Sequence, residues 1–528
     1  MFRTAELGQA VPKSEFNQRE PLLRQALLEV QANLRISSRF PVIILFAGVD
    51  GGGKGDTVNV LNEWMDPRWL ITRAYDDPSD EERDRPEYWR FWRDLPPKGH
   101  IGLFLSSWYS QPILRRVYDK DDEAVFDDHL DRIMAFENAL ADDGALILKF
   151  WMHLSHDAQK RRLKKLEKDP LTSWRVTQQD WDHWQIYDRF EATAERAIMR
   201  TSTGSAPWTI VEGVDPCYRS LTVGDIIRTE ISKHLEDAEK KALLMQELAA
   251  QDKPDMQTWQ VEGGEGDNAD ALLASPMKRA TVLSSLDMSL SLKKTDYKKQ
   301  LKECQARLNK LHRKALKKRI STILLFEGAD AAGKGGAIRR ITAALDARHY
   351  QVIPIAAPTD EERAHHYLWR FWRHLSRAGR INIFDRSWYG RVLVERVEGF
   401  AAEDEWRRAF AEINEFEEQL TDHGILLVKY WVHITKDEQL ERFKAREETP
   451  HKRWKLTEED WRNREKWDDY DLAVNDIVER TSTHSAPWVL VEGNDKRFAR
   501  IKVIRTFCDR LEAMIEGKTL SYPSDEAI

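Results

Sequence analysis

The chain has 528 residues, of which 41% are hydrophobic and 32% are charged, so we expect two packed domains rather than one core. The formal net charge of −7 excludes a generally basic chain, so a polyanion would need a local basic surface, and nucleic acid is not expected as a partner. Three widely spaced cysteines, no transmembrane-length apolar run and no signal-peptide pattern predict a cytoplasmic protein without membrane contact.

The first motif in chain order is the glycine-rich segment LFAGVDGGGKGDT at residues 45–57. It matches the G-x-x-x-x-G-K pattern of phosphate-binding loops, in which inward-pointing backbone N–H groups and a lysine hold an anion. The Ser or Thr that usually follows the lysine and helps to hold magnesium is Gly55 here. A single match of this kind is also typical of an ordinary glycine-rich turn.

The motif recurs as LFEGADAAGKGGA at residues 325–337, and the two loop lysines, Lys54 and Lys334, are 280 positions apart. The same shift aligns RTSTGSAPWTIVEG at 200 with RTSTHSAPWVLVEG at 480 without a gap. A repeat of this length indicates a duplicated domain rather than a solenoid unit.

We therefore expect an N-terminal domain at residues 15–235 and a C-terminal domain at residues 286–515. Between them, residues 236–285 begin with a charged helical pattern and continue into VEGGEGDNADALLASP, which is typical of a flexible linker.

In the second copy, short apolar runs alternate with helical patterns. The predicted strands are STILLF from 321, YQVIPIAA from 350, INIFD from 381, ILLVKYWVHI from 425 and WVLVEG from 488. This alternation predicts an α/β domain with a parallel sheet flanked by helices, and it places the glycine-rich loop between a strand and a helix, where a phosphate loop belongs.

Two carboxylates could replace the missing hydroxyl. Asp330 lies inside the loop, and Asp385 ends a predicted strand, the position of a metal-directed acid in phosphate-loop enzymes. Together they could bind one or two magnesium ions, or one could orient the attacking oxygen. The structural alternatives are a turn-forming Asp for Asp330 and a strand-end cap for Asp385.

GADAAGKGG followed by FDRSWYGR resembles polyphosphate kinase family 2, and the tandem arrangement is similar to its class II members. The resemblance covers nearly the whole chain apart from the ends and the linker. It implies two phosphate-loop kinase-like domains of thymidylate-kinase-like fold, each with a helical lid. It also implies magnesium-dependent transfer of the terminal phosphoryl group of inorganic polyphosphate to AMP, which forms ADP.

Two other functions stay open on the sequence. A polyphosphate-dependent nucleoside diphosphate kinase would differ only in using ADP or GDP as acceptor. A non-catalytic regulator that binds polyphosphate or a nucleotide is disfavoured, because pure binding has no need of the strand-end acid at Asp385.

The resemblance implies Asp330, Lys334, Asp385 and Arg386 as catalytic residues, with Asp330 and Asp385 as metal ligands. It also implies substrate contacts from Arg370 and from Lys452 and Arg453 in the lid. Phosphoryl transfer needs dense positive charge around the transferring group, which adds the nearby Arg391 as a candidate. The loop glycines Gly333 and Gly335 are candidates because their backbone N–H groups can bind phosphate oxygens.

A basic run at residues 310–319 holds six Lys or Arg in ten positions, among them Lys314, Lys317 and Lys318. Because it directly precedes the first strand of the second copy, we predict that it guides the polyphosphate chain; the alternative is a solvated helix face. The lid helix is expected to begin with a capping box at Thr457-x-x-Asp460.

The first copy lacks several of these groups. Leu105 and Ser106 stand where the second copy has Asp385 and Arg386, and Thr172 and Ser173 stand in place of the basic lid pair. We therefore expect the first copy to be an inactive structural partner, which could still bind a phosphate at its loop. We expect it to pack with the second copy as an intramolecular pseudo-dimer, which leaves further homo-oligomerisation open.

Overall fold

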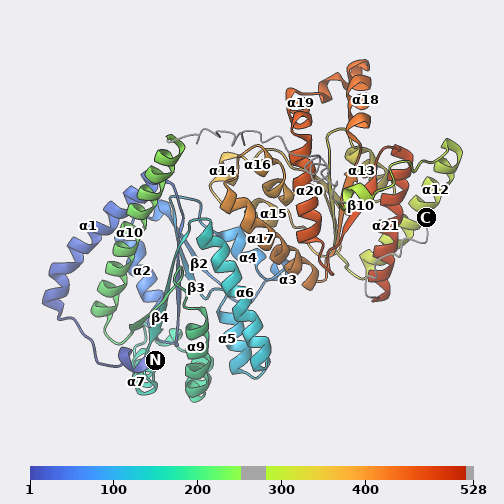
Figure 1. The fold of residues 1–528 in the computed structure, drawn as a ribbon. Coiled ribbons are helices and arrows are strands. Elements are labelled where there is room, and N and C mark those ends of the chain that lie inside the picture. Colours follow the sequence, from blue (N-terminus) through green and yellow to red (C-terminus); the bar gives the residue numbers. More distant parts are fainter. Residues whose placement is uncertain (251–280, 519–528) are drawn as a thin grey trace, which may run out of the picture. The chain divides into compact units, whose positions relative to one another are not determined.

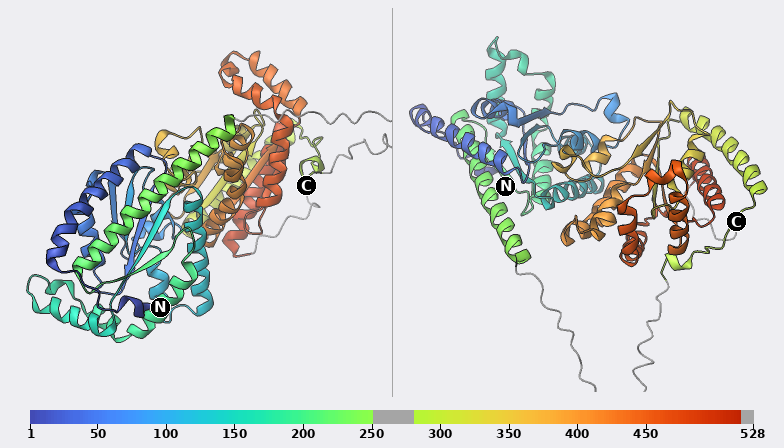
Figure 2. Two further views of the ribbon diagram at one scale, coloured as in Figure 1. Left: turned by 60° about the vertical axis from the view of Figure 1, so that its left-hand side comes forward. Right: turned by 90° about the horizontal axis from the view of Figure 1, so that it is seen from above.

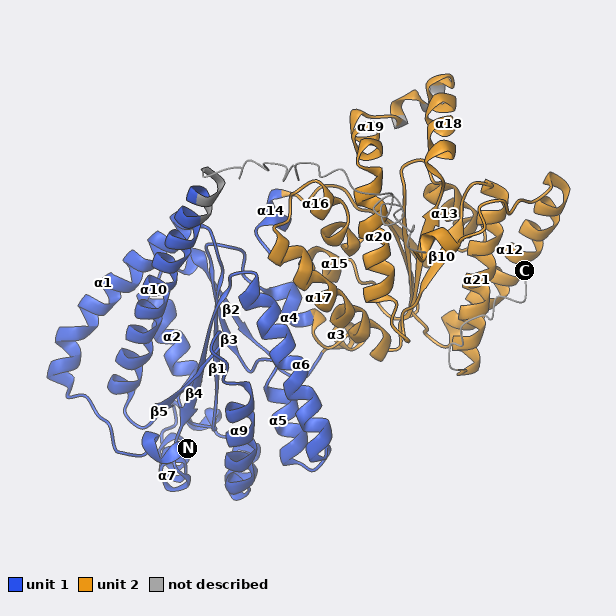
Figure 3. Cartoon of the chain, in the orientation of Figure 1, with its two compact units in different colours: residues 1–78, 90–263, 360–366 blue, residues 79–89, 264–359, 367–528 orange. Residues whose placement is uncertain are grey.

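The computed structural model divides into two compact units (Figure 3). Unit 1 comprises residues 1–78, 90–263 and 360–366, and unit 2 comprises residues 79–89, 264–359 and 367–528; the structure describes all of these except residues 251–280 and 519–528. Part of the predicted linker therefore lies outside the described residues.

Unit 1 is built on a parallel five-stranded sheet with the order β2-β3-β1-β4-β5. Its strands are β1 (Val42–Gly48), β2 (Leu70–Ala74), β3 (Ile101–Leu105), β4 (Leu146–His153) and β5 (Trp208–Glu212). One face of the sheet is covered by α1 (Lys13–Ser37), α2 (Lys54–Trp64) and α10 (Pro216–Ala250) (Figure 1). The remaining helices are α4 (Trp89–Asp94), α5 (Ser110–Val117), α6 (Glu123–Asp142), α7 (His156–Lys168), α8 (Gln178–Gln185) and α9 (Tyr187–Thr201), with the short η1 (Phe2–Ala5), η2 (Pro67–Trp69) and η3 (Ser173–Arg175).

Unit 2 repeats this plan with the parallel order β10-β9-β6-β8-β7. Its strands are β6 (Thr322–Gly328), β7 (Tyr350–Pro354), β8 (Ile381–Asp385), β9 (Leu426–His433) and β10 (Trp488–Glu492). Helices α12 (Lys294–Lys317), α13 (Lys334–Thr342) and α21 (Lys496–Glu516) pack together on one face (Figure 2).

The other elements of unit 2 include α17 (Glu403–Asp422) and α20 (Trp467–Thr481), which pack together behind β9. The shorter ones are α3 (Asp80–Arg83), α15 (Trp369–Arg373), α16 (Val394–Val397), α18 (Lys436–Glu447), α19 (Glu458–Glu465), η4 (Leu283–Ser285), η5 (Trp388–Val392) and η6 (Pro450–Lys455). The helix α14 (Asp360–Arg363) belongs to unit 1.

All five predicted strands of the second copy are present, and the predicted α/β fold with tandem parallel sheets is confirmed. The central strands are apolar and buried because helices cover both faces of a parallel sheet. The two cores contain corresponding residues, for example Phe46 stacked on Phe150 in unit 1 and Phe326 stacked on Tyr430 in unit 2.

Both units also bury the same ion pair. In unit 2, Lys429 Nζ donates to Glu417 at 2.7 Å, to the Tyr389 hydroxyl and to the Thr481 carbonyl, and the side chains of Lys429 and Glu417 are 0% and 1% exposed. Lys149 and Glu137 form the equivalent pair in unit 1. Because every donor of the ammonium has a partner, the buried charge is tolerated.

The lid of unit 2 consists of α18, η6 and α19, which project beyond the body of the unit (Figure 1). The predicted capping box is present: the Thr457 side chain accepts from Asp460 N, and the Asp460 carboxylate accepts from Thr457 N. The helix that begins there, α19, ends at Glu465, and α20 begins at Trp467. Between them, the Lys466 ammonium binds Glu398 and the Val397 carbonyl.

Helix α10 continues to Ala250, so the charged first part of the predicted linker is helical. Within the described part of the chain, no helix combines the length and the apolar character needed to cross a bilayer.

Candidate active site

The phosphate loop of unit 2 joins β6 to α13 at the carboxyl edge of the sheet. Gly328 has φ +149°, and a Cβ there would lie 2.4 Å from the Val432 carbonyl oxygen, so only glycine fits against β9. Gly333, at φ +115°, caps α13, and Gly335 has open space beside it. The helix therefore presents its N-terminal N–H groups to the solvent side of the loop, as an anion site requires. Lys334 begins the helix and donates to the Gly328 carbonyl.

Asp330 is held on two sides within this loop. Its carboxylate accepts a hydrogen bond from Asn463 Nδ2 at 2.9 Å and lies 3.4 Å from the Arg386 guanidinium. Asn463 belongs to the lid helix α19, whereas Arg386 follows β8. The loop acid is therefore connected both to the lid and to the neighbouring strand.

Asp385 ends the strand β8 beside the loop, and Arg386 directly follows it. Arg386 has φ +66°, a sparsely populated backbone conformation for a residue with a side chain, and its N–H donates to the Phe326 carbonyl at 3.1 Å. This turn directs the chain away from the sheet directly after Asp385. Strained backbone of this kind is concentrated at functional sites.

A third carboxyl group, Glu327, lies at the end of β6. It is 4% exposed and accepts a hydrogen bond from Ser387 Oγ at 2.7 Å. Burial raises the pKa of Glu327, and the hydrogen bond from Ser387 and the charges of Lys334 and Arg386 only partly offset this effect.

A basic cavity of about 730 Å³ opens on the solvent side of the loop. Seven Lys or Arg side chains and three Asp side chains line it together with the loop backbone: Lys334, Arg339, Arg386, Arg442, Arg446, Lys496 and Arg500, with Asp330, Asp385 and Asp460. The excess of positive charge suits a polyanion.

Arg442 fixes the wall of the basic cavity. It is 5% exposed, and its guanidinium donates to the carbonyls of Ala331, Ala332, Gly493 and Asn494 and to Glu438. The arginine therefore ties the loop to α18 and to the end of β10.

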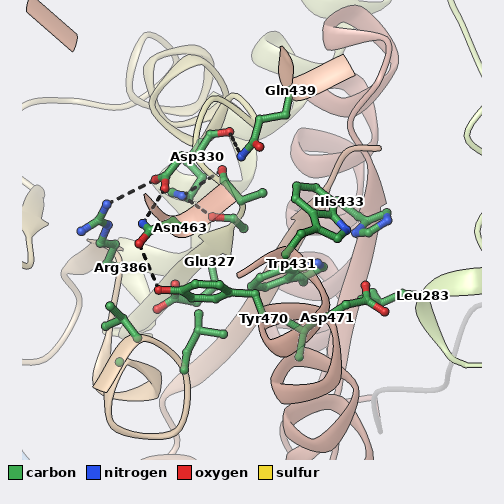
Figure 4. A pocket seen from close by; sticks show the side chains of 18 of the residues that line it. Leu283, Glu327, Asp330, Arg386, Trp431, His433, Gln439, Asn463, Tyr470 and Asp471 are labelled. Atoms are coloured by element: carbon green, nitrogen blue, oxygen red, sulfur yellow. Dashed lines mark hydrogen bonds and ion pairs between the residues drawn. The ribbon is translucent and has the colours of Figure 1, made fainter. Parts of the chain in front are cut away.

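A second cavity, of about 100 Å³, shares Asp330, Lys334 and Arg386 with the basic one; Figure 4 shows Asp330 and Arg386 among its lining residues. It is mostly apolar and is lined by aromatic side chains, among them Trp431, Trp467 and Tyr470. The Trp431 indole is buried, with 6% of its surface exposed, and its Nε1 has no hydrogen-bond partner among the described residues. Burial lowers the pKa of His433, which also lines the cavity, to about 4, so its ring is neutral at pH 7.

Asp330, Lys334 and Arg386 line both cavities, and Asp385, Gly333 and Gly335 line the basic one. The structure therefore brings together all four predicted catalytic residues and both loop glycines.

Three of the other predicted substrate residues lie outside both cavity walls. Arg370 on α15 donates to the Ala356 carbonyl, and Arg391 pairs with Glu395 and Glu405 at 3.2 and 3.7 Å. Arg453 in η6 donates to the Glu447 carbonyl. The backbone of Lys452 lies in the same short helix, but its side chain lies outside the described residues.

The basic run is at the opposite edge of the sheet. Lys314, Lys317 and Lys318 lie at the end of α12, directly before the amino end of β6, whereas the loop follows the carboxyl end. The seven residues of β6 separate the two ends by roughly 20 Å. Lys318 is bound to the Ile515 carbonyl. The structure does not bring these lysines together with the loop.

A model of the polyphosphate kinase 2 family matches residues 11–241 and 291–518. The chain belongs to the polyphosphate kinase 2 family. It is 52% identical to a polyphosphate:AMP phosphotransferase of Pseudomonas aeruginosa over 97% of this chain and 99% of that protein. It is 38% identical to a polyphosphate:AMP phosphotransferase of Acinetobacter johnsonii, over 89% and 91% of the two chains.

The fold of this polyphosphate kinase 2 chain is also similar to a solved structure. A crystal structure of a polyphosphate kinase 2 from Pseudomonas aeruginosa superposes with a TM-score of 0.84 at 49% identity, covering 98% of this chain and 99% of that one.

Sequence reasoning on this polyphosphate kinase 2 chain missed several site residues. Glu327 and Asn463 carry no recognisable motif, although the change from FEGAD in the second copy to FAGVD in the first marks Glu327. Arg500 and Lys496 begin the helix after β10, so they follow the carboxyl end of a strand as Asp385 does. Their position after the carboxyl end of a strand is the sequence signal that could have identified them as site residues.

Proposed function

We propose that the chain is a polyphosphate:AMP phosphotransferase and that unit 2 carries the reaction. The observation that carries this proposal is that two unlike cavities share three charged residues. Asp330, Lys334 and Arg386 line both a large basic cavity and a smaller, mostly apolar one. A polyanionic donor suits the first, and a nucleoside suits the second. Relatives of nearly the same length bear this activity in their names.

On the donor side, the terminal phosphates of polyphosphate occupy the basic cavity. Loop N–H groups, Lys334, Arg386 and Arg500 surround the phosphoryl group that is transferred. Lys496 and Arg446 receive the following phosphates. Charge of this density lowers the barrier because negative charge is shared among donor, phosphoryl group and acceptor in the transition state.

On the acceptor side, AMP occupies the apolar cavity with its base among Trp431, Trp467 and Tyr470 and its phosphate toward Lys334. The buried Trp431 Nε1 supplies a hydrogen-bond donor for the base. A cavity of about 100 Å³ is smaller than ordinary ligand pockets, so the lid helix α19 and the start of α20 must move to admit AMP. Closure over the bound nucleotide then excludes water, which would otherwise hydrolyse the donor.

No general base is needed in this reaction. The attacking group is an oxygen of the AMP phosphate, which is ionised at neutral pH, so no proton has to be removed from it. The protein therefore acts by aligning the two phosphates and by neutralising their charge.

Magnesium fits the donor set. Asp330 and Asp385 both line the basic cavity and offer carboxylate oxygens, and Mg²⁺ is usually held by one or two carboxylates together with substrate phosphates and water. When bound, the ion would neutralise phosphate charge and help to align the transferring group. Asn463 and Arg386 would hold Asp330 in place for this role.

We also infer that unit 1 does not transfer phosphate and that the two domains, at about 15–235 and 286–515, act as an intramolecular pseudo-dimer. Leu105 and Ser106 remove the strand-end acid and its arginine from unit 1. The three cysteines are all free, which is typical of a reducing compartment and supports the cytoplasm.

The experiment is a transfer assay with purified protein, magnesium and long-chain polyphosphate, in which AMP, ADP, GMP and GDP are compared as acceptors. We expect ADP formation from AMP at the highest kcat/KM and none without polyphosphate. Preference for ADP or GDP would favour the nucleoside diphosphate kinase instead. If no acceptor receives a phosphoryl group, the chain would be a non-catalytic binding protein.

A further inference from the structure

Unit 1 keeps a cavity that corresponds to the acceptor cavity of unit 2. Its volume is about 160 Å³, and fourteen of its sixteen lining residues lie 280 positions before residues that line the unit 2 cavity. The corresponding pairs include Asp50 with Asp330, Lys54 with Lys334, and Trp151 with Trp431. An inactive domain kept only for packing would have no reason to retain this space.

Two buried polar groups in this cavity lack partners. Trp151 is 4% exposed and Gln159 is 2% exposed, and among the described residues neither Trp151 Nε1 nor Gln159 Oε1 has a hydrogen-bond partner. An unsatisfied buried donor and an unsatisfied buried acceptor are each costly, so their presence beside an open space indicates a ligand that satisfies both. The edge of a nucleobase carries both kinds of group.

The loop end of the cavity holds Lys54, which lies 4.0 Å from the Asp50 carboxylate; that carboxylate is also 2.6 Å from His183. Lys54 begins α2, a helix of eleven residues, and donates to the Gly48 carbonyl, as Lys334 does to Gly328 in unit 2. Gly53, at φ +95°, caps that helix. The lysine and the N-terminal N–H groups of the helix can hold one phosphate.

The donor side of unit 1 carries a carboxylate of its own, that of Asp56. Asp56 stands where unit 2 has Gly336, and its carboxylate accepts from Arg175 at 2.7 Å and from Arg162 at 3.1 Å, with Arg219 at 4.0 Å. Burial opposes ionisation of Asp56, but the hydrogen bond and charge of Arg175 and the charges of Arg219 and Arg162 outweigh it and lower its pKa. The three arginines that could attract polyphosphate are thus held by an internal anion, which offsets one of their positive charges.

We propose that unit 1 is a second nucleoside monophosphate site that binds AMP without transferring phosphate. The proposal rests on the proposed acceptor in unit 2. The base lies against Trp151 and Gln159, and the phosphate lies at Lys54. No transfer follows, because Asp56 occupies the donor side and Leu105 and Ser106 replace the acid and the arginine.

The test is the number of AMP molecules bound per full-length chain, measured by equilibrium dialysis with labelled AMP and no polyphosphate. We expect two. Leu114→Trp fills the unit 1 cavity and Val394→Trp fills the corresponding place in unit 2; each should leave one AMP bound, and the double variant none. A wild-type chain that binds a single AMP, with none left in Val394→Trp, would overturn the proposal.

A second pair of variants, with smaller changes in side-chain volume, distinguishes loss of AMP recognition from loss of folding. Trp151→Phe removes the unpartnered N–H together with part of a buried ring, so the melting temperature of the ligand-free protein should fall modestly. AMP affinity at one of the two sites should fall about tenfold, while the other site keeps its affinity. Trp431→Phe should do the same at the other site and raise the KM for AMP. An unchanged affinity in Trp151→Phe would contradict base recognition in unit 1.

The outcomes of the two proposals can be told apart. If the wild-type chain binds two AMP but transfers nothing to AMP, the second site stands and the proposed function fails. If it transfers to AMP but binds one, the proposed function stands and the second site fails.

Discussion

Asn463 of the lid helix α19 donates a 2.9 Å hydrogen bond to the carboxylate of Asp330 in the phosphate loop. In unit 1 the corresponding positions are His183 and Asp50, whose side chains are 2.6 Å apart. The lid and the loop are thus joined in both units, although by different chemistry. In unit 2 this bond makes the position of the loop acid depend on the position of the lid.

We therefore expect Asn463→Ala to lower kcat about 10- to 100-fold, the effect of losing a hydrogen bond to a charged group. Asn463 also lines the cavity proposed for AMP, so the KM for AMP should rise, but by a smaller factor than kcat falls. Steady-state kinetics with varied AMP would measure the split. His183→Ala is the matched variant and should cost far less turnover. Equal losses in the two variants would show that the bond matters only for the fold.

Lys334→Ala and Asp385→Asn should each lower turnover by about 10² to 10³, because each removes a main electrostatic partner of the transferring phosphate. The measurement is ADP formation at saturating AMP and excess magnesium, with circular dichroism to confirm folding. Lys54→Ala, the same change in unit 1, should lose far less activity than Lys334→Ala. A comparable loss would mean that both units carry chemistry.

Asp56→Gly should open the donor side of unit 1. Without Asp56, three guanidinium groups repel one another, and Arg219 is only 3% exposed, so the melting temperature in anion-free buffer should fall. Inorganic tripolyphosphate should then raise the melting temperature of the variant more than that of the wild type, because binding stabilises the folded state.

Gly336→Asp is the reciprocal change in unit 2. A Cβ at Gly336 lies 3.2 Å from the Arg500 guanidinium, whose flexible end can shift, so the new carboxylate is expected to pair with it. Polyphosphate-dependent turnover should be lost while AMP still binds. Retained turnover would show that the basic cavity is not the donor site.

His433 should make unit 2 sensitive to acid. Its folded-state pKa of about 4 is below the ordinary value of 6.5, so the unfolded chain binds more protons between these values. The stabilisation is present above pH 6.5 and is lost as the pH falls toward 4. At pH 5 the free energy of unfolding should have decreased by about 2 kcal/mol for this reason. Urea unfolding at pH 7 and pH 5 should show a smaller decrease for His433→Phe than for the wild type.

The sequence by itself determined the duplication, the parallel sheets and the residues of the phosphate loop. These features are local, since an apolar run, a glycine that needs positive φ and an acid at a strand end are each specified within a few residues. Asp330, Lys334, Asp385 and Arg386 meet in space because the loop and the end of β8 lie at the same edge of neighbouring strands, which the strand pattern already implies.

Only the tertiary structure decided which other charges join them. Arg442, Arg446, Asn463 and Arg500 are more than one hundred residues from the loop, and packing of α18, α19 and α21 brings them to it. Lys314, Lys317 and Lys318 are close to the loop in sequence, but a helix that leads into a strand ends at that strand's amino edge, so β6 holds them apart from it. The positions of charged residues along the chain can be read from the sequence. The edge of the sheet at which those residues lie depends on the whole fold.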